Sequence, residues 1–128
     1  MIHIEYTDEF IEGEDGPNFY WRGKPKDYLR LVNDLHDLGC NEGIEIQLDK
    51  VEYITMLSNI KIVMKSSSEG NVLCTRQNNT VLVDLRCSIW RNLISLLLTV
   101  SFFKSHQYIE FDDLNLVEDA NFIISSEK

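Results

Sequence analysis

Cysteine, proline and basic residues are scarce in this sequence of 128 residues, and no long apolar run is present. Its three cysteines (Cys40, Cys74 and Cys87) are an odd number without a C-x-x-C pair, which argues against a disulfide framework and a structural zinc site. Reduced thiols are typical of a cytoplasmic protein. The longest apolar stretch, residues 93–103, is interrupted by serine and threonine. It is far shorter than the roughly 20 residues of a membrane span, so we expect no membrane segment.

Motifs for common enzymatic chemistries are also missing. The six glycines form neither G-x-G-x-x-G nor G-x-x-x-x-G-K-[ST], so no loop is arranged to wrap phosphates, and no G-x-S-x-G elbow is present. Asp34 and His36 would stand about 200° apart on a helix, so they cannot converge on one metal ion. Cys87, just before a predicted helix, and the pair Asp112 and Asp113 remain as candidates for a small enzyme. We expect no catalytic activity, no metal and no cofactor.

Apolar and polar residues alternate in eight short segments, with the period of half-buried β-strands. Such alternation predicts mostly antiparallel strands with one solvent-exposed face. Residues 77–79 (Q-N-N) indicate a hairpin turn between two of the segments. The predicted strands cover residues 2–6, 19–22, 44–49, 60–65, 72–76, 81–85, 108–112 and 121–126.

Two helices, predicted over residues 25–38 and 88–103, differ in their hydrophobic patterns. The first is amphipathic, begins at Pro25 and ends before Gly39, as expected of a surface helix on a sheet. The second is apolar nearly all round, and a helix of this kind is buried on more than one side. It is either a central core helix or a helix whose second side contacts another chain. We therefore predict an α+β fold with two helices packed on one face of mostly antiparallel sheet; the candidate dimer contacts are Trp90, Leu98 and Phe102.

The order strand, strand, helix, strand, strand occurs twice along the chain. Residues 19–28 align with residues 81–90 at an offset of 62. The matches are mostly of apolar periodicity, which either an internal ββαββ duplication or two unrelated halves would produce. Residues 66–70, the flexible-looking link between the halves, are few, so the halves should be closely joined. We predict one domain over residues 1–128, with 1–66 and 70–128 as the pseudo-repeats.

The acidic residues outnumber the basic ones, 21 to 12, which gives a formal net charge of −9. The excess lies at the two ends: residues 1–18 hold six acids and no base, and residues 105–128 hold six acids and one base. A chain this acidic is a poor candidate for binding nucleic acid, whose phosphates require lysine and arginine. Two acidic loops would instead steer a basic protein towards the chain. Solubility alone is the competing explanation.

Aromatic side chains among acidic ones are typical of protein-binding surfaces. The solvent-exposed face of the predicted sheet should display Tyr20, Leu73, Leu82, Tyr108 and Ile123. The predicted partner-binding set combines two tyrosines with the acidic loops; it consists of Asp8, Glu9, Glu12, Glu14, Asp15, Tyr20, Tyr108, Asp112, Asp113, Glu118 and Asp119.

In outline, the sequence resembles the immunity proteins of bacterial polymorphic and contact-dependent toxin systems. The resemblance rests on the opening strand M-I-H-I-E-Y (1–6), on G-K-P-K-D-Y-L-R-L-V (23–32), and on the closing stretches 108–113 and 121–124. It implies a cytoplasmic protein that binds one toxin domain and blocks its active site or its substrate. Many such toxins are basic nucleases, which the acidic ends would complement. The alternative function is that of a non-catalytic homo-oligomeric structural or adaptor protein.

Overall fold

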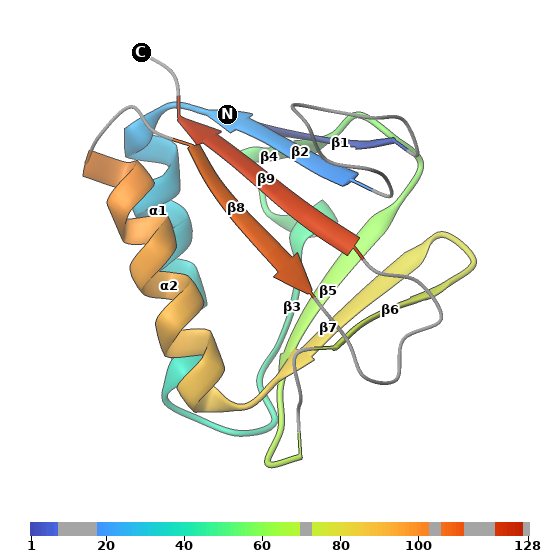
Figure 1. Ribbon diagram of the computed structural model, residues 1–128, viewed down its shortest axis with the longest axis vertical. Helices are drawn as coiled ribbons and strands as arrows, with labels where there is room; N and C mark the ends of the chain where they lie inside the picture. Colours follow the sequence, from blue (N-terminus) through green and yellow to red (C-terminus); the bar gives the residue numbers. More distant parts are fainter. Residues whose placement is uncertain (8–17, 70–72, 103–105, 112–119, 127–128) are drawn as a thin grey trace.

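The computed structural model describes residues 1–7, 18–69, 73–102, 106–111 and 120–126. These residues form two β-sheets and two α-helices, which confirms the α+β class (Figure 1). Two short 3₁₀ segments, η1 and η2, complete the regular structure. In chain order the elements are β1 (Ile2–Thr7), β2 (Asn18–Gly23), α1 (Pro25–Leu35), η1 (His36–Gly39), β3 (Glu45–Gln47), η2 (Leu48–Lys50), β4 (Ile54–Met56), β5 (Lys61–Ser66), β6 (Leu73–Gln77), β7 (Thr80–Leu85), α2 (Cys87–Phe102), β8 (His106–Phe111) and β9 (Ala120–Ser126).

Both sheets are mixed, so the expectation of mostly antiparallel pairing is wrong. The five-stranded sheet has the order β4-β1-β2-β9-β8, and the four-stranded sheet has the order β3-β5-β7-β6. β1 with β2, β3 with β5, β6 with β7 and β8 with β9 are antiparallel, but β1 with β4, β2 with β9, and β5 with β7 are parallel. Two of these parallel pairs, β2–β9 and β5–β7, join a strand of one half of the chain to a strand of the other. Local alternation carries no information about such distant partners.

The two parallel pairs that join the halves are built alike. Asn18–Gly23 pairs with residues 121–126, and Thr80–Leu85 pairs with Lys61–Ser66, over six residues in each case. In both places one residue, Lys24 or Arg86, separates the strand from the helix that follows. Each sheet therefore contains one antiparallel strand pair from each half of the chain.

A buried aromatic residue fixes each helix to the neighbouring strand in the same way. The hydroxyl of Tyr28 in α1 donates a hydrogen bond to the Ser125 carbonyl at 2.8 Å, and Nε1 of Trp90 in α2 donates one to the Lys65 carbonyl at 2.8 Å. Ser125 pairs with Arg22, and Lys65 pairs with Asp84. In both halves, therefore, the residue whose carbonyl accepts the hydrogen bond pairs with the strand residue six positions before the aromatic donor.

The two helices pack against each other and lie on the same side of the molecule, beside the space between the sheets (Figure 1). α1 ends at Leu35, three residues earlier than predicted, because the chain tightens into η1. α2 begins at Cys87 and ends at Phe102, one residue before the predicted bounds at each end. Cys87 is therefore the first residue of the helix.

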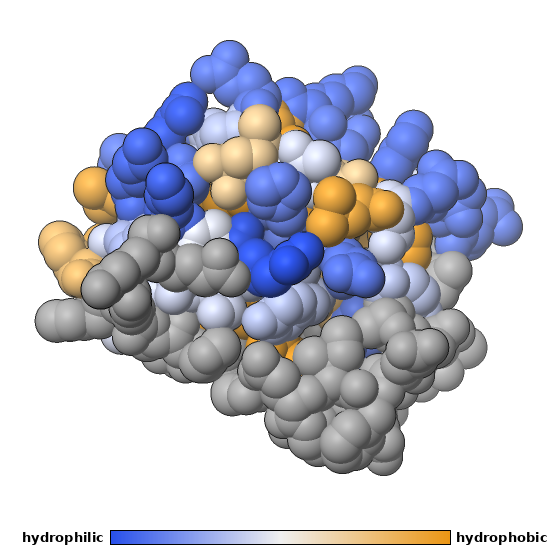
Figure 2. Space-filling view, turned by 90° about the horizontal axis from the view of Figure 1, so that it is seen from above, coloured by the Kyte–Doolittle hydropathy of each residue, from blue (hydrophilic) through white to orange (hydrophobic). Residues whose placement is uncertain are grey.

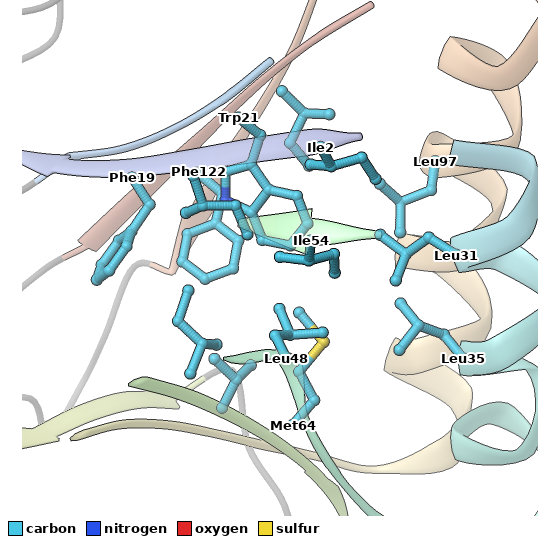
Figure 3. Close-up of a cluster of buried hydrophobic side chains, with 14 of the residues drawn as sticks. Ile2, Phe19, Trp21, Leu31, Leu35, Leu48, Ile54, Met64, Leu97 and Phe122 are labelled. Atoms are coloured by element: carbon cyan, nitrogen blue, oxygen red, sulfur yellow. The ribbon is translucent and has the colours of Figure 1, made fainter. Parts of the chain in front are cut away.

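One hydrophobic core lies between the two sheets and the helices. Phe19, Trp21 and Phe122 of the five-stranded sheet point towards Met64 of the four-stranded sheet, and Leu35 closes the helical side (Figure 3). The Phe122 ring contacts the other two, with its centroid 5.1 Å from that of Phe19 and 5.3 Å from that of Trp21. Burial of apolar surface from both sheets in one core is the main force that holds them together.

Candidate protein-interaction site

The acidic part of the predicted partner-binding set lies outside the described residues. It falls in two segments, 8–17 and 112–119, that contain nine acids and no base. The other twelve acids of the chain are matched in number by its twelve bases. The formal net charge of −9 is thus equal to the charge of these two segments alone. Their nine acids are Asp8, Glu9, Glu12, Glu14, Asp15, Asp112, Asp113, Glu118 and Asp119.

The described strand ends show where these two segments join the sheet. Residues 8–17 connect Thr7 to Asn18, and residues 112–119 connect Phe111 to Ala120. Thr7 pairs with Asn18, Asn18 pairs with Asn121, and Phe111 pairs with Ala120. Adjacent strands are about 4.8 Å apart, so the four attachment points span about 15 Å. Both acidic segments are therefore tethered to the same end of the five-stranded sheet.

The two predicted contact tyrosines occupy one row across this sheet. Glu5 pairs with Tyr20, Tyr20 with Ile123, and Ile123 with Tyr108. Tyr20 is half-buried, and the Arg22 guanidinium lies 5.8 Å from the centre of its ring. Only the backbone of Tyr108 is described. Seen from above, the molecule shows hydrophobic residues scattered among hydrophilic ones (Figure 2).

Ile123 is fully buried, so the expectation that it lies on a solvent-exposed face is wrong. Its strand, β9, lies between β2 and β8. Alternation assigns a side chain to one face of the sheet but does not show what covers that face. Leu82 is half-buried, and the side chain of Leu73 is not among those described.

A polar cluster that the sequence interpretation missed connects α1 to the segment before β4. The Tyr53 hydroxyl donates a hydrogen bond to Asp34 Oδ2 at 2.6 Å, and the Arg30 guanidinium lies 4.3 Å from the centre of the Tyr53 ring. Arg30 also pairs with Glu52 at 3.0 Å. With Asn33 and Val51, these residues line a surface pocket of about 470 Å³. The four contact residues form two local pairs, Arg30 with Asp34 and Glu52 with Tyr53, which lie about 20 residues apart in the sequence, and no motif joins the pairs.

The environment of Tyr53 makes stability depend on pH. Burial, followed by the hydrogen bond to Asp34, raises the pKa of Tyr53 above its ordinary value of about 10. The folded protein therefore keeps the phenolic proton at a pH at which the unfolded chain loses it. The resulting contribution to the free energy of unfolding is complete below about pH 10 and falls as the pH rises further.

Replacement of the hydroxyl tests this contribution. Tyr53→Phe is expected to lower the free energy of unfolding by about 1 kcal/mol at pH 7, because Asp34 loses its hydrogen-bond donor. The variant should also lose less stability than the unmodified protein between pH 9.5 and 11. Urea denaturation at several pH values measures both effects, and equal losses in the two proteins above pH 10 would contradict the assignment.

The described cysteines form no metal centre. Cys40 Sγ lies 3.5 Å from His36 Nε2, one helical turn earlier, and both residues are exposed. Cys87 is half-buried at the start of α2. Among the residues that the structure describes, no three histidine, cysteine or acidic side chains gather closely enough to hold a metal ion.

The predicted dimer contacts on α2 do not share one face. Trp90 is only 1% exposed, because its indole faces the four-stranded sheet and donates its hydrogen bond to Lys65 there. Its inclusion in an intermolecular contact is therefore wrong. Leu98 and Phe102, by contrast, are 37% and 66% exposed. The described part of the chain contains no helix with the length and apolar character needed to cross a membrane.

Comparison with known proteins identifies no relative of this chain. No family model, no curated protein and no solved structure matches it. The observations that bear on its function are the placement of charge and the packing of its own residues.

Proposed function

We propose that this chain is an immunity protein that binds a basic toxin domain in the cytoplasm and neutralises it by covering its active or substrate-binding site. The observation that carries the proposal is the tethering of both acidic segments to one end of the five-stranded sheet. The two segments hold nine carboxylates and no base, and the strand ends that they join span about 15 Å.

The proposed mode of action is electrostatic competition. An enzyme that acts on nucleic acid attracts phosphates with lysine and arginine around its cleft. A concentrated group of carboxylates attracts the same basic residues, accelerates encounter and favours the orientation that covers the cleft. This role requires no catalytic group on the chain, and the chain's part is to bind and to occlude.

Co-expression tests the proposal. The product of the reading frame immediately upstream of this gene is produced in a bacterial host, with and without this chain. We expect the upstream product to stop growth and this chain to restore colony counts at least 100-fold. A version of the gene with an early stop codon is the control and should not restore growth. A harmless upstream product, or a toxic one that the chain does not bind, would contradict the proposal.

A further inference from the structure

Three polar residues stand next to one another on the outer face of the five-stranded sheet. His3 of β1 pairs with Arg22 of β2, and Arg22 pairs with Ser125 of β9. Their neighbours along the strands, such as Trp21 and Ile124, are buried in the core between the two sheets. Because successive side chains of a strand point to opposite faces, the three polar residues lie on the face turned away from that core. Adjacent strands are about 4.8 Å apart, so the three positions span about 10 Å.

The guanidinium of Arg22 is oriented by an aromatic ring but has no acceptor. It lies 5.8 Å from the centre of the Tyr20 ring, a cation–π contact. Its Nε is buried without a hydrogen-bond partner, and Arg22 belongs to neither of the ion pairs found among the described residues. Glu5, on the same face and paired with Tyr20, forms no ion pair with it there. In a chain with 21 acids and 12 bases, a half-buried arginine without a carboxylate is a group prepared for an anion from outside.

The two side chains that flank Arg22 also have unused donors. Within the described part of the chain, neither the His3 imidazole nor the Ser125 hydroxyl forms a hydrogen bond; the Ser125 carbonyl alone accepts one, from α1. Ser125 is only 4% exposed, so its hydroxyl has little access to bulk water. Thr55, the next residue of the row on β4, already donates its hydroxyl to the sulfur of Met1 at 3.1 Å. The unused donors of this row therefore belong, among the described side chains, to His3, Arg22 and Ser125.

The number and kind of these donors favour a phosphate group over a carboxylate. An imidazole N–H, the two-pronged edge of a guanidinium and a hydroxyl offer donors from three strands. A carboxylate has two oxygens, whereas a phosphate group carries three or more on one centre and can accept from all three side chains at once. The planar guanidinium supplies the positive charge and suits two oxygens of the same group. Because the donors come from strand faces and not from a glycine-rich loop, no phosphate-binding motif marks them in the sequence.

We propose that His3, Arg22 and Ser125 form a binding site for the phosphate group of a small molecule, with Arg22 as the central contact. The site contains one fixed positive charge in a protein with a formal net charge of −9, so binding is weak. We expect a dissociation constant of about 1–10 mM for inorganic phosphate. The site needs no second protein, so its test is independent of the proposed toxin.

Titration of the full chain with inorganic phosphate, followed by nuclear magnetic resonance at constant pH and ionic strength, tests the proposal. The backbone amide signals of His3, Arg22 and Ser125 should shift and saturate. Arg22→Gln should raise the dissociation constant about 10-fold or more, because the charge and the paired donors are lost. Ser125→Ala should raise it about 3-fold. Arg86→Gln removes the same charge from an exposed arginine between β7 and α2; it is the matched control and should bind as the unmodified protein does.

Two further ligands define the chemistry of the site. Acetate should bind about 5-fold more weakly than inorganic phosphate, because it has fewer oxygens. Equal or tighter binding of glycerol 3-phosphate would identify a phosphate ester as the natural ligand, and weaker binding would identify the free ion. Three outcomes would overturn the proposal: shifts that do not saturate, acetate that binds as well as phosphate, or equal affinity in Arg22→Gln and Arg86→Gln. Far-ultraviolet circular dichroism confirms that each variant is folded.

Discussion

Reversal of four carboxylates is expected to slow association with the proposed basic partner about 100-fold at low ionic strength. The variant combines Asp8→Lys, Glu9→Lys, Asp112→Lys and Asp113→Lys, at positions that directly follow the ends of β1 and β8. Stopped-flow mixing with the purified upstream product at 20–300 mM salt measures the association rate. The unmodified chain should lose rate steeply as salt increases, because salt screens its charges, and the variant should show little dependence.

A matched variant separates the placement of charge from its total. Asp37, Glu42, Glu45 and Glu69 are exposed and lie elsewhere in the fold. Their replacement by lysine changes the net charge by the same amount but leaves residues 8–17 and 112–119 intact. The association rate of this control variant should fall less than about 5-fold. Equal slowing of the two variants would show that the acidic end of the sheet is not the docking surface.

Removal of the Trp90 side chain is expected to cause a large loss of stability. Trp90→Ala should lower the free energy of unfolding by about 3–5 kcal/mol, because the residue is 1% exposed and its removal leaves a cavity. Urea denaturation followed by circular dichroism measures the loss. A loss below 1 kcal/mol would mean that the indole is not packed in the core.

Milder substitutions test the matching hydrogen bonds of the two halves. Tyr28→Phe keeps the ring and removes the donor to Ser125, and Trp90→Phe removes the donor to Lys65 together with part of the ring system. We expect each lost hydrogen bond to lower the free energy of unfolding by about 1 kcal/mol. Trp90→Phe should lower it further, because the phenyl ring is smaller than the indole. No measurable loss in Tyr28→Phe would contradict an anchoring role for that bond.

Local pattern was sufficient to predict the fold class and most elements. Alternation of Ile2 and Ile4 with polar residues predicts β1, and the same signal predicts β5 around Ile62. Pro25 marks the start of α1 as predicted. The turn between β6 and β7 is also where the sequence places it, and Asn78 adopts the positive φ of 56° that asparagine tolerates better than most residues.

Features that depend on distant partners could not be predicted in this way. β4, with only three residues, carries too short a pattern, and its existence depends on pairing with β1. The orientation of Trp90 follows from packing against Lys65 and not from the helix alone, which is apolar nearly all round. Tyr53 contacts Asp34 and Arg30 of α1, and no residue near Tyr53 in the sequence predicts those contacts.

The pairing of strands from both halves in each sheet also affects how the chain folds during synthesis. β2 is synthesised roughly 100 residues before its neighbour β9. Until then, Phe19 and Trp21 lack Phe122, and the edge of β2 lacks its hydrogen-bonding partner. Pairings between such distant segments form slowly and leave nascent chains open to aggregation. Rapid production of this protein should therefore depend on chaperones that shield the growing chain.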